Sequence, residues 1–177
     1  MLSLAAALHV APAAAATLQA PKFTREQMEA VLADARPFRF VYGTRDPAFT
    51  ATLRARAMTL AVRAFGGDST QVVAGRDAND TLIAAGPIFL VGGPDENEWT
   101  RRLATALPVR FEKQGFRWQG QLYDRPRDAI HLSWPNPLAP NRFLLLSAGN
   151  TPEALAGGSS YVLSDDDWRI QIGRAHV

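Results

Sequence analysis

The chain of 177 residues contains no cysteine, only two lysines (Lys22 and Lys113) and three histidines. The lack of cysteine excludes disulfide bonds, thiolate metal sites and a cysteine nucleophile. The positive charge is carried mainly by arginines that are spread along the chain, and the net charge is only +2. Because nucleic-acid binding needs clustered positive charge, we predict no nucleic-acid partner.

The common catalytic and cofactor motifs are also missing. The sequence has no G-x-S-x-G nucleophile elbow, no Walker motif and no G-x-G-x-x-G fingerprint. His9 and His176 lie near the chain ends, which leaves His131, in the middle of an expected strand, as the one candidate general base. The run Asp165–Asp167 lacks the spaced ligands and the glycine of a calcium loop. We therefore predict no complete catalytic site, no cofactor and no metal site.

Both ends of the chain differ from its middle. Residues 2–16 are small and apolar, are too few to span a bilayer, and end in three alanines. This pattern predicts a signal peptide over residues 1–16, a periplasmic or secreted protein and no membrane span. The alternative is a piece of a longer protein that begins at an internal methionine. Residues 172–177 match the in-frame translation of a sequencing adapter, so we predict that this tail is not native.

The middle of the chain alternates helical and strand patterns. A capping box at Thr24 predicts a helix to about residue 35, within a helical lead-in over residues 17–36. A single α/β domain is expected over residues 37–170. Its expected helices cover residues 49–64, 80–85 and 96–106 and begin again at 151; its expected strands cover residues 38–42, 70–74, 87–91, 109–112, 116–123, 129–134 and 142–147.

This alternation predicts a mainly parallel sheet in a flavodoxin- or Rossmann-like three-layer fold. Residues 113–115 predict an antiparallel β-hairpin added to it.

Four expected strands end in small or polar residues. In open α/β sheets, ligands bind beyond the carboxyl ends of the strands, and helix starts after Thr44 and Pro94 would favour an anion there. The alternative is that these residues only form turns. The candidate binding residues are Gly43, Thr44, Asp46, Gly92, Gly93, Asn136, Arg142, Ser147 and Asn150.

Five segments between residues 38 and 150 resemble one family. They are Phe38–Thr44, Ile88–Asn97, Leu107–Phe111, Trp134–Phe143 and Ser147–Asn150. Together they resemble the domain that follows the hydrolase module in bacterial prolyl-oligopeptidase-like α/β-hydrolase proteins, and the Pro-Asn-Pro-Leu sequence within Trp134–Phe143 is the most distinctive part. The family's catalytic serine, acid and histidine have no matching positions here. The resemblance therefore implies an accessory module, either freestanding and exported or a fragment of a longer enzyme.

Three functional hypotheses remain open at this point. The first is a non-catalytic accessory module whose partner is a serine hydrolase module of the same or another chain. The second is the late segment of an α/β-hydrolase domain with Asp46 as the triad acid, which requires an imidazole within about 3 Å of Asp46. The third is a stand-alone protein that binds a small molecule or anion through Arg45 and Arg142.

Overall fold

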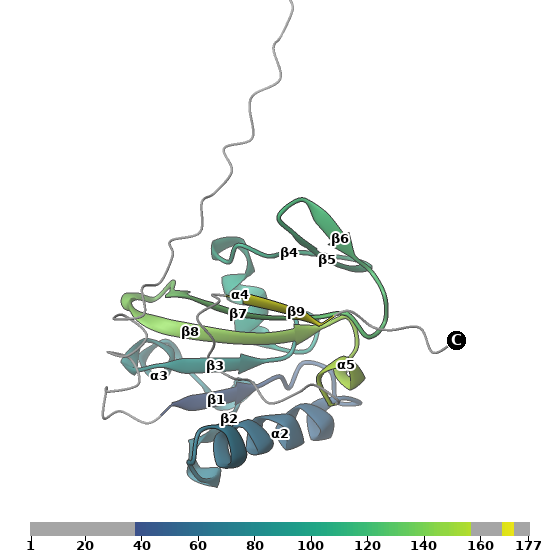
Figure 1. Ribbon diagram of the computed structural model, residues 1–177. Coiled ribbons are helices and arrows are strands. Elements are labelled where there is room, and N and C mark those ends of the chain that lie inside the picture. The colour runs from purple at the N-terminus through teal and green to yellow at the C-terminus, as the bar shows by residue number, and fades with distance from the viewer. Residues whose placement is uncertain (1–37, 157–167, 172–177) are drawn as a thin grey trace, which may run out of the picture.

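The structure is a computed structural model that describes residues 38–156 and 168–171 (Figure 1). The strands are β1 (Arg39–Tyr42), β2 (Val72–Ala74), β3 (Ile88–Val91), β4 (Arg110–Glu112), β5 (Gly115–Trp118), β6 (Gln121–Tyr123), β7 (Ala129–Asn136), β8 (Ala139–Gly149) and β9 (Trp168–Gln171). The α-helices are α2 (Thr50–Thr59), α3 (Asp80–Ala85), α4 (Glu98–Leu103) and α5 (Pro152–Ala156). Short turns of other helix types are η1 (Leu60–Ala64), η2 (Ser69–Gln71), η3 (Gly75–Asp77) and η4 (Ala104–Ala106).

The larger of two sheets has six strands in the order β2-β1-β3-β8-β7-β9. Strands β2, β1, β3 and β8 pair in parallel, β7 is antiparallel to β8, and β9 is antiparallel to β7. Five of the six strands therefore run in one direction. The expectation of an α/β fold with a mainly parallel sheet is confirmed at this level.

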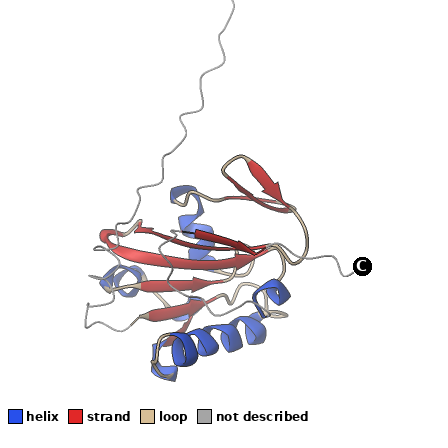
Figure 2. Ribbon diagram, viewed as in Figure 1, coloured by secondary structure: helices blue, strands red, loops and turns tan. Residues whose placement is uncertain are grey.

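Successive residues of the apolar strands point to opposite faces of this sheet, and other elements cover both faces. On one side, Phe40, Phe89 and Leu145 pack against α2 and α5. On the other side, Val41, Leu90 and Leu146 pack against α3, α4 and the smaller sheet. Figures 1 and 2 show α2 and the smaller sheet on opposite sides of the large sheet. All four residues of the central strand β3 are buried, as its continuous apolar run predicts.

The expected helix over residues 49–64 is present as α2 followed by η1, a five-residue π-helical segment. Gly66 ends it with a positive φ of 65°, and the Gly67 N–H donates to the Ala61 carbonyl at 2.8 Å. Four phenylalanines then fill the space between this helix and the sheet: Phe38, Phe40, Phe65 and Phe89 have ring centroids 4.8–6.2 Å apart. They anchor α2 over β1 and β3.

The expected antiparallel hairpin is present, but it belongs to a separate three-stranded sheet, β4-β5-β6. The strand expected over residues 116–123 is broken at Gln119 and Gly120, whose positive φ values of 48° and 84° fit the tight turn of a two-residue hairpin. Phe116 and Trp118 of this sheet are buried in the core on the α4 side. The smaller sheet therefore covers the large one and does not extend it.

The segment expected as a loop over residues 135–140 is the tip of a second hairpin. Strand β7 continues to Asn136 and β8 begins at Ala139, with a register shift at Pro135 and Asn136. The Asn136 side chain accepts from the Leu138 N–H at 3.0 Å and donates to the Ile83 carbonyl at 2.6 Å. This buried amide shapes the turn and fixes it to α3.

Three expectations lie outside the described residues: the signal peptide, the helix that begins at Thr24, and the tail over residues 172–177. The acidic run Asp165–Asp167 lies outside them too. Within residues 38–156, no helix has both the length and the apolar character needed to cross a membrane.

Candidate functional site

The carboxyl ends of β2, β1, β3 and β8 meet at one edge of the large sheet, because these strands are parallel and adjacent. Gly75, Gly43, Gly92 and Asn150 are the first residues beyond these strands. This edge is the predicted ligand site. In sheets of this kind, ligands bind at the topological switch point, where the chain leaves two adjacent strands toward opposite sides of the sheet. Here the chain leaves β1 toward β2 on one side and leaves β3 toward β8 on the other, so the switch point lies between β1 and β3.

Seven of the nine candidate binding residues lie at this edge: Gly43, Thr44, Asp46, Gly92, Gly93, Ser147 and Asn150. Asn136 and Arg142 do not, and their placement corrects the prediction. Strand β7 runs antiparallel to β8, so Asn136, at its end, and Arg142, early in β8, lie at the opposite edge. The prediction was wrong here because it treated all four strands as parallel.

Residues of the chain itself fill the switch point. The buried side chain of Asn97 donates to the carbonyls of Val41, at 2.9 Å, and Val91, at 3.0 Å, which join β1 to β3. Its oxygen accepts from the N–H groups of Trp99, at 2.9 Å, and Thr100, at 3.3 Å, and so caps α4. All four hydrogen bonds of this amide are therefore used within the fold.

The two loops beside Asn97 pack directly on each other. The Arg45 N–H donates to the Glu96 carbonyl at 2.9 Å. A Cβ atom at Gly43 would overlap that same carbonyl, so the backbones can meet only because residue 43 is glycine. Gly43 thus serves a close approach between protein segments, and the loops leave the crevice at this point closed.

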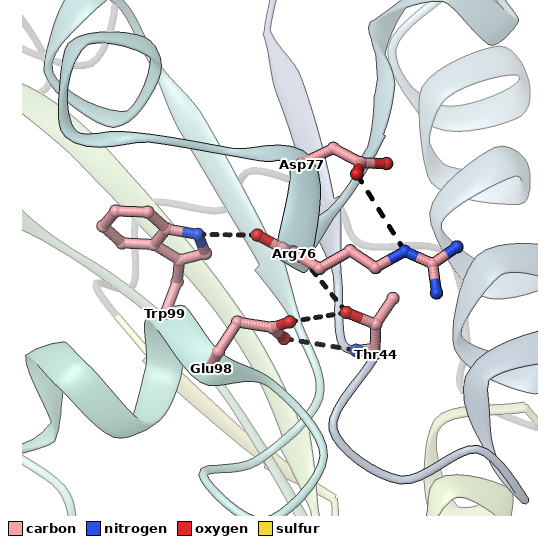
Figure 3. Close-up of polar contacts among 6 residues, drawn as sticks. Thr44, Arg76, Asp77, Glu98 and Trp99 are labelled. Atoms are coloured by element: carbon pink, nitrogen blue, oxygen red, sulfur yellow. Dashed lines mark hydrogen bonds and ion pairs between the residues drawn. The ribbon is translucent and has the colours of Figure 1, made fainter.

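A polar network joins β1, β2 and α4 next to this contact (Figure 3). The Glu98 carboxylate accepts from the Thr44 hydroxyl and, at 3.2 Å, from the Thr44 N–H. The Thr44 hydroxyl oxygen accepts in turn from the Arg76 N–H at 3.1 Å, and the Trp99 indole donates to the Gly75 carbonyl at 3.0 Å. The network ties the loop after β2 to the loop after β1 and to the first turn of α4.

The start of α4 is supplied with side-chain acceptors from the protein, and a carboxylate lies just before α2. Asn97 caps α4, with Glu98 in its first turn, and the Asp46 carboxylate accepts from the Ala48 N–H at 2.9 Å ahead of α2. Asp46, Glu96 and Glu98 together make the edge acidic. An added anion would meet carboxylates here, so the geometry does not favour the anion site that the helix starts predicted.

Glu96 was not among the predicted site residues. Its half-buried carboxylate lies over Gly93, with Oε2 at 3.0 Å from the position that a Cβ there would take. Burial raises the pKa of Glu96 above its ordinary value, and the nearby carboxylates of Asp95 and Asp46 raise it further, although main-chain hydrogen bonds partly oppose this. The signal for Glu96 in the sequence is only that an acidic pair follows Gly-Gly-Pro.

Two further predicted residues have structural contacts. Asn150 donates to the carbonyls of Tyr123, at 3.0 Å, and Arg125, at 2.8 Å, and so ties the end of β8 to the smaller sheet. The Ser147 carbonyl accepts from the Gly92 N–H at 2.9 Å. The Ser147 hydroxyl is fully buried on the face toward α2 and α5 and has no hydrogen-bond partner.

The sheet order bears on the hypothesis that Asp46 is a triad acid. Tyr42, Val91, Ser147 and His131 lie level on four adjacent strands. With strands about 4.8 Å apart, the backbone of β7 lies about 14 Å from that of β1, which does not favour the 3 Å side-chain contact that the hypothesis requires. Ser147 and His131 are direct cross-strand neighbours, yet the serine hydroxyl makes no hydrogen bond and is not poised as a nucleophile beside a base.

In the part of the chain that the structure describes, no three histidine, aspartate or glutamate side chains gather as they would around a metal ion. No family model matches the chain, and no curated protein is significantly similar to it in sequence.

Proposed function

We propose that this chain is a non-catalytic α/β accessory module that works beside a serine hydrolase module of the same or another chain. The segments that resemble the domain attached to prolyl-oligopeptidase-like hydrolases are the basis of the family assignment. The structural support is separate. Asn97 occupies the switch point between β1 and β3, where an enzyme of this sheet type would hold its ligand.

The contacts around Asn97 favour a structural role for the whole edge. Thr44 and Glu98 hydrogen-bond each other, Asp46 caps the chain ahead of α2, and Asn150 holds the smaller sheet. Each of these polar side chains already has a partner within the fold. A catalytic group, in contrast, needs a face that can reach the reacting atoms.

The test is a hydrolysis assay of the purified full chain with p-nitrophenyl acetate and a chromogenic peptide. We expect the rate to equal that of buffer and to be unchanged in Asp46→Asn and His131→Ala. Turnover above buffer that either substitution abolishes would show that the chain is itself an enzyme. Cooperative urea unfolding of each protein serves as the control for folding.

We also propose that the fold is of the flavodoxin-like three-layer type. The order β2-β1-β3 has the arrangement 2-1-3, and the parallel strand β8 lies next to β3, although β7 precedes β8 in the chain. Helices α2 and α3, which precede β2 and β3, pack on opposite faces of the sheet, as successive crossovers in such folds do. A crystal structure with a different strand order would reject this arrangement.

Export of the chain is part of the same proposal and rests on the apolar residues 2–16. Expression with the native N-terminus in a bacterium that has a periplasm should give a mature protein whose sequence begins at or near Thr17. Recovery of the uncleaved chain from the cytoplasm would reject export.

A further inference from the structure

The most unusual buried group in the described residues is the side chain of Arg56, on α2. It is only 8% exposed, and two of its nitrogen atoms, Nε and Nη2, are buried without a hydrogen-bond partner. These two N–H groups lie on the same edge of the planar guanidinium and point in parallel. They form the edge that binds both oxygens of one carboxylate.

The contrast with Arg102 shows what is missing. Arg102 is exposed, and its two terminal nitrogens pair with the two carboxylate oxygens of Asp80. Arg56 is buried, so a hydrogen-bond partner would stabilise it more, but its Nε and Nη2 atoms have none. Burial without a partner also lowers the pKa of Arg56 below its ordinary value. An arginine in a protein keeps its charge. The unpaired Nε–Nη2 edge therefore destabilises the fold, and a bound anion would remove this destabilisation.

The surroundings of Arg56 indicate the kind of anion. From Phe49 to Phe65 the helix has no acidic residue, and its buried neighbours Leu53, Ala57 and Leu60 are apolar. The sheet residues beneath α2 are mainly apolar as well. The Ser147 hydroxyl is an exception: it lies on this same face of the sheet, fully buried and without a partner. A phosphate would bring about two charges and four oxygens next to these apolar side chains, whereas a carboxylate with a short apolar chain brings one charge and is less costly to bury there.

We propose that the Nε–Nη2 edge of Arg56 is the binding site of a small free monocarboxylate with an apolar chain. The guanidinium binds both carboxylate oxygens, and the apolar chain of the ligand packs against the apolar side chains next to Arg56 on α2. This site is separate from the acidic strand-end edge and does not depend on the accessory role proposed above.

The first experiment uses the full-length protein labelled with ¹⁵N and follows the Nε–Hε signals of its arginines during titration with sodium butyrate. Sodium chloride keeps the ionic strength constant at pH 7. We expect the Arg56 signal, assigned by its loss in Arg56→Lys, to shift and saturate. Arg54, which is exposed on the same helix, is the internal control and should not saturate. An Arg56 signal that stays still, or that moves linearly together with Arg54, overturns the proposal.

Thermal melting gives a second readout that does not depend on Arg56→Lys folding. Butyrate should raise the Tm of the wild-type protein more than equal ionic strengths of chloride or phosphate do. Arg56→Met keeps the length of the side chain without its charge, so it should fold and lose the butyrate effect. Arg56→Lys, which replaces the fork by a point charge, should weaken binding about tenfold or more. An equal butyrate effect in Arg56→Met, or none in the wild type, overturns the site.

Discussion

The substitution Asn97→Ala tests the closed switch point most directly. It removes the cap of α4, which costs about 1 kcal/mol. It also leaves the Val41 carbonyl without the 2.9 Å hydrogen bond from Asn97, at about 1–3 kcal/mol for a buried acceptor. The Val91 carbonyl loses less, because it keeps the 3.0 Å hydrogen bond from the Gly43 N–H. The expected loss is therefore about 2–4 kcal/mol, a large part of the usual 5–15 kcal/mol of a domain.

The assay is urea unfolding followed by tryptophan fluorescence, with the m-value compared between proteins. Asn97→Ser is the matched control, because serine keeps the helix cap but lacks the amide donors. It should be about 1 kcal/mol more stable than Asn97→Ala and still well below the wild type. A loss under about 1 kcal/mol in Asn97→Ala, or wild-type stability in Asn97→Ser, would refute the role assigned to the Asn97 amide.

Three further predictions use the same unfolding assay. Gly43→Ala should destabilise the fold by about 1–3 kcal/mol, because the new Cβ overlaps the Glu96 carbonyl; stability equal to the wild type would reject that close contact. Glu96→Gln should be more stable than the wild type at pH 7, with the difference vanishing on acidification: the pKa of Glu96 is raised in the folded state, so the wild type loses stability as the pH rises through it. A difference that grows toward low pH would contradict the sign. Ser147→Ala should be neutral or stabilise by about 1 kcal/mol, since it removes a buried hydroxyl without a partner, and clear destabilisation would mean that the hydroxyl has one.

The sequence was sufficient to predict the elements that rest on local pattern. The continuous apolar run at residues 87–91 predicted the central strand β3, and the helical spacing after Pro47 predicted α2 and η1, which end just before Gly66. These predictions succeeded because burial and chain-ending residues act within a few positions of each other. The two-residue turn at Gln119–Gly120 was missed because its left-handed backbone begins at a glutamine.

The residues of a strand do not determine whether it runs parallel or antiparallel to its neighbour. The apolar residues of β7 would suit a parallel or an antiparallel neighbour equally, and only the short hairpin through Asn136 makes β7 antiparallel to β8. This single reversal moved Asn136 and Arg142 to the far edge of the sheet. The same limit applies to Asn97 and Glu96, because each has one partner more than fifty residues away, on β1 or its following loop.

The two candidate ligand sites, the strand-end edge and the Nε–Nη2 edge of Arg56, differ in whether their polar groups already have hydrogen-bond partners. At the strand-end edge, the side chains of Asn97, Thr44 and Glu98 have partners within the fold, so a ligand could enter only by breaking those hydrogen bonds. On α2, the Nε and Nη2 atoms of Arg56 have no partner, so a ligand with the right oxygens would add hydrogen bonds without breaking any at these atoms. Buried polar groups without partners are rare in folded proteins, and each costs stability until something binds it. Hydrogen bonding therefore favours the Nε–Nη2 edge of Arg56 over the edge that sheet topology alone would select.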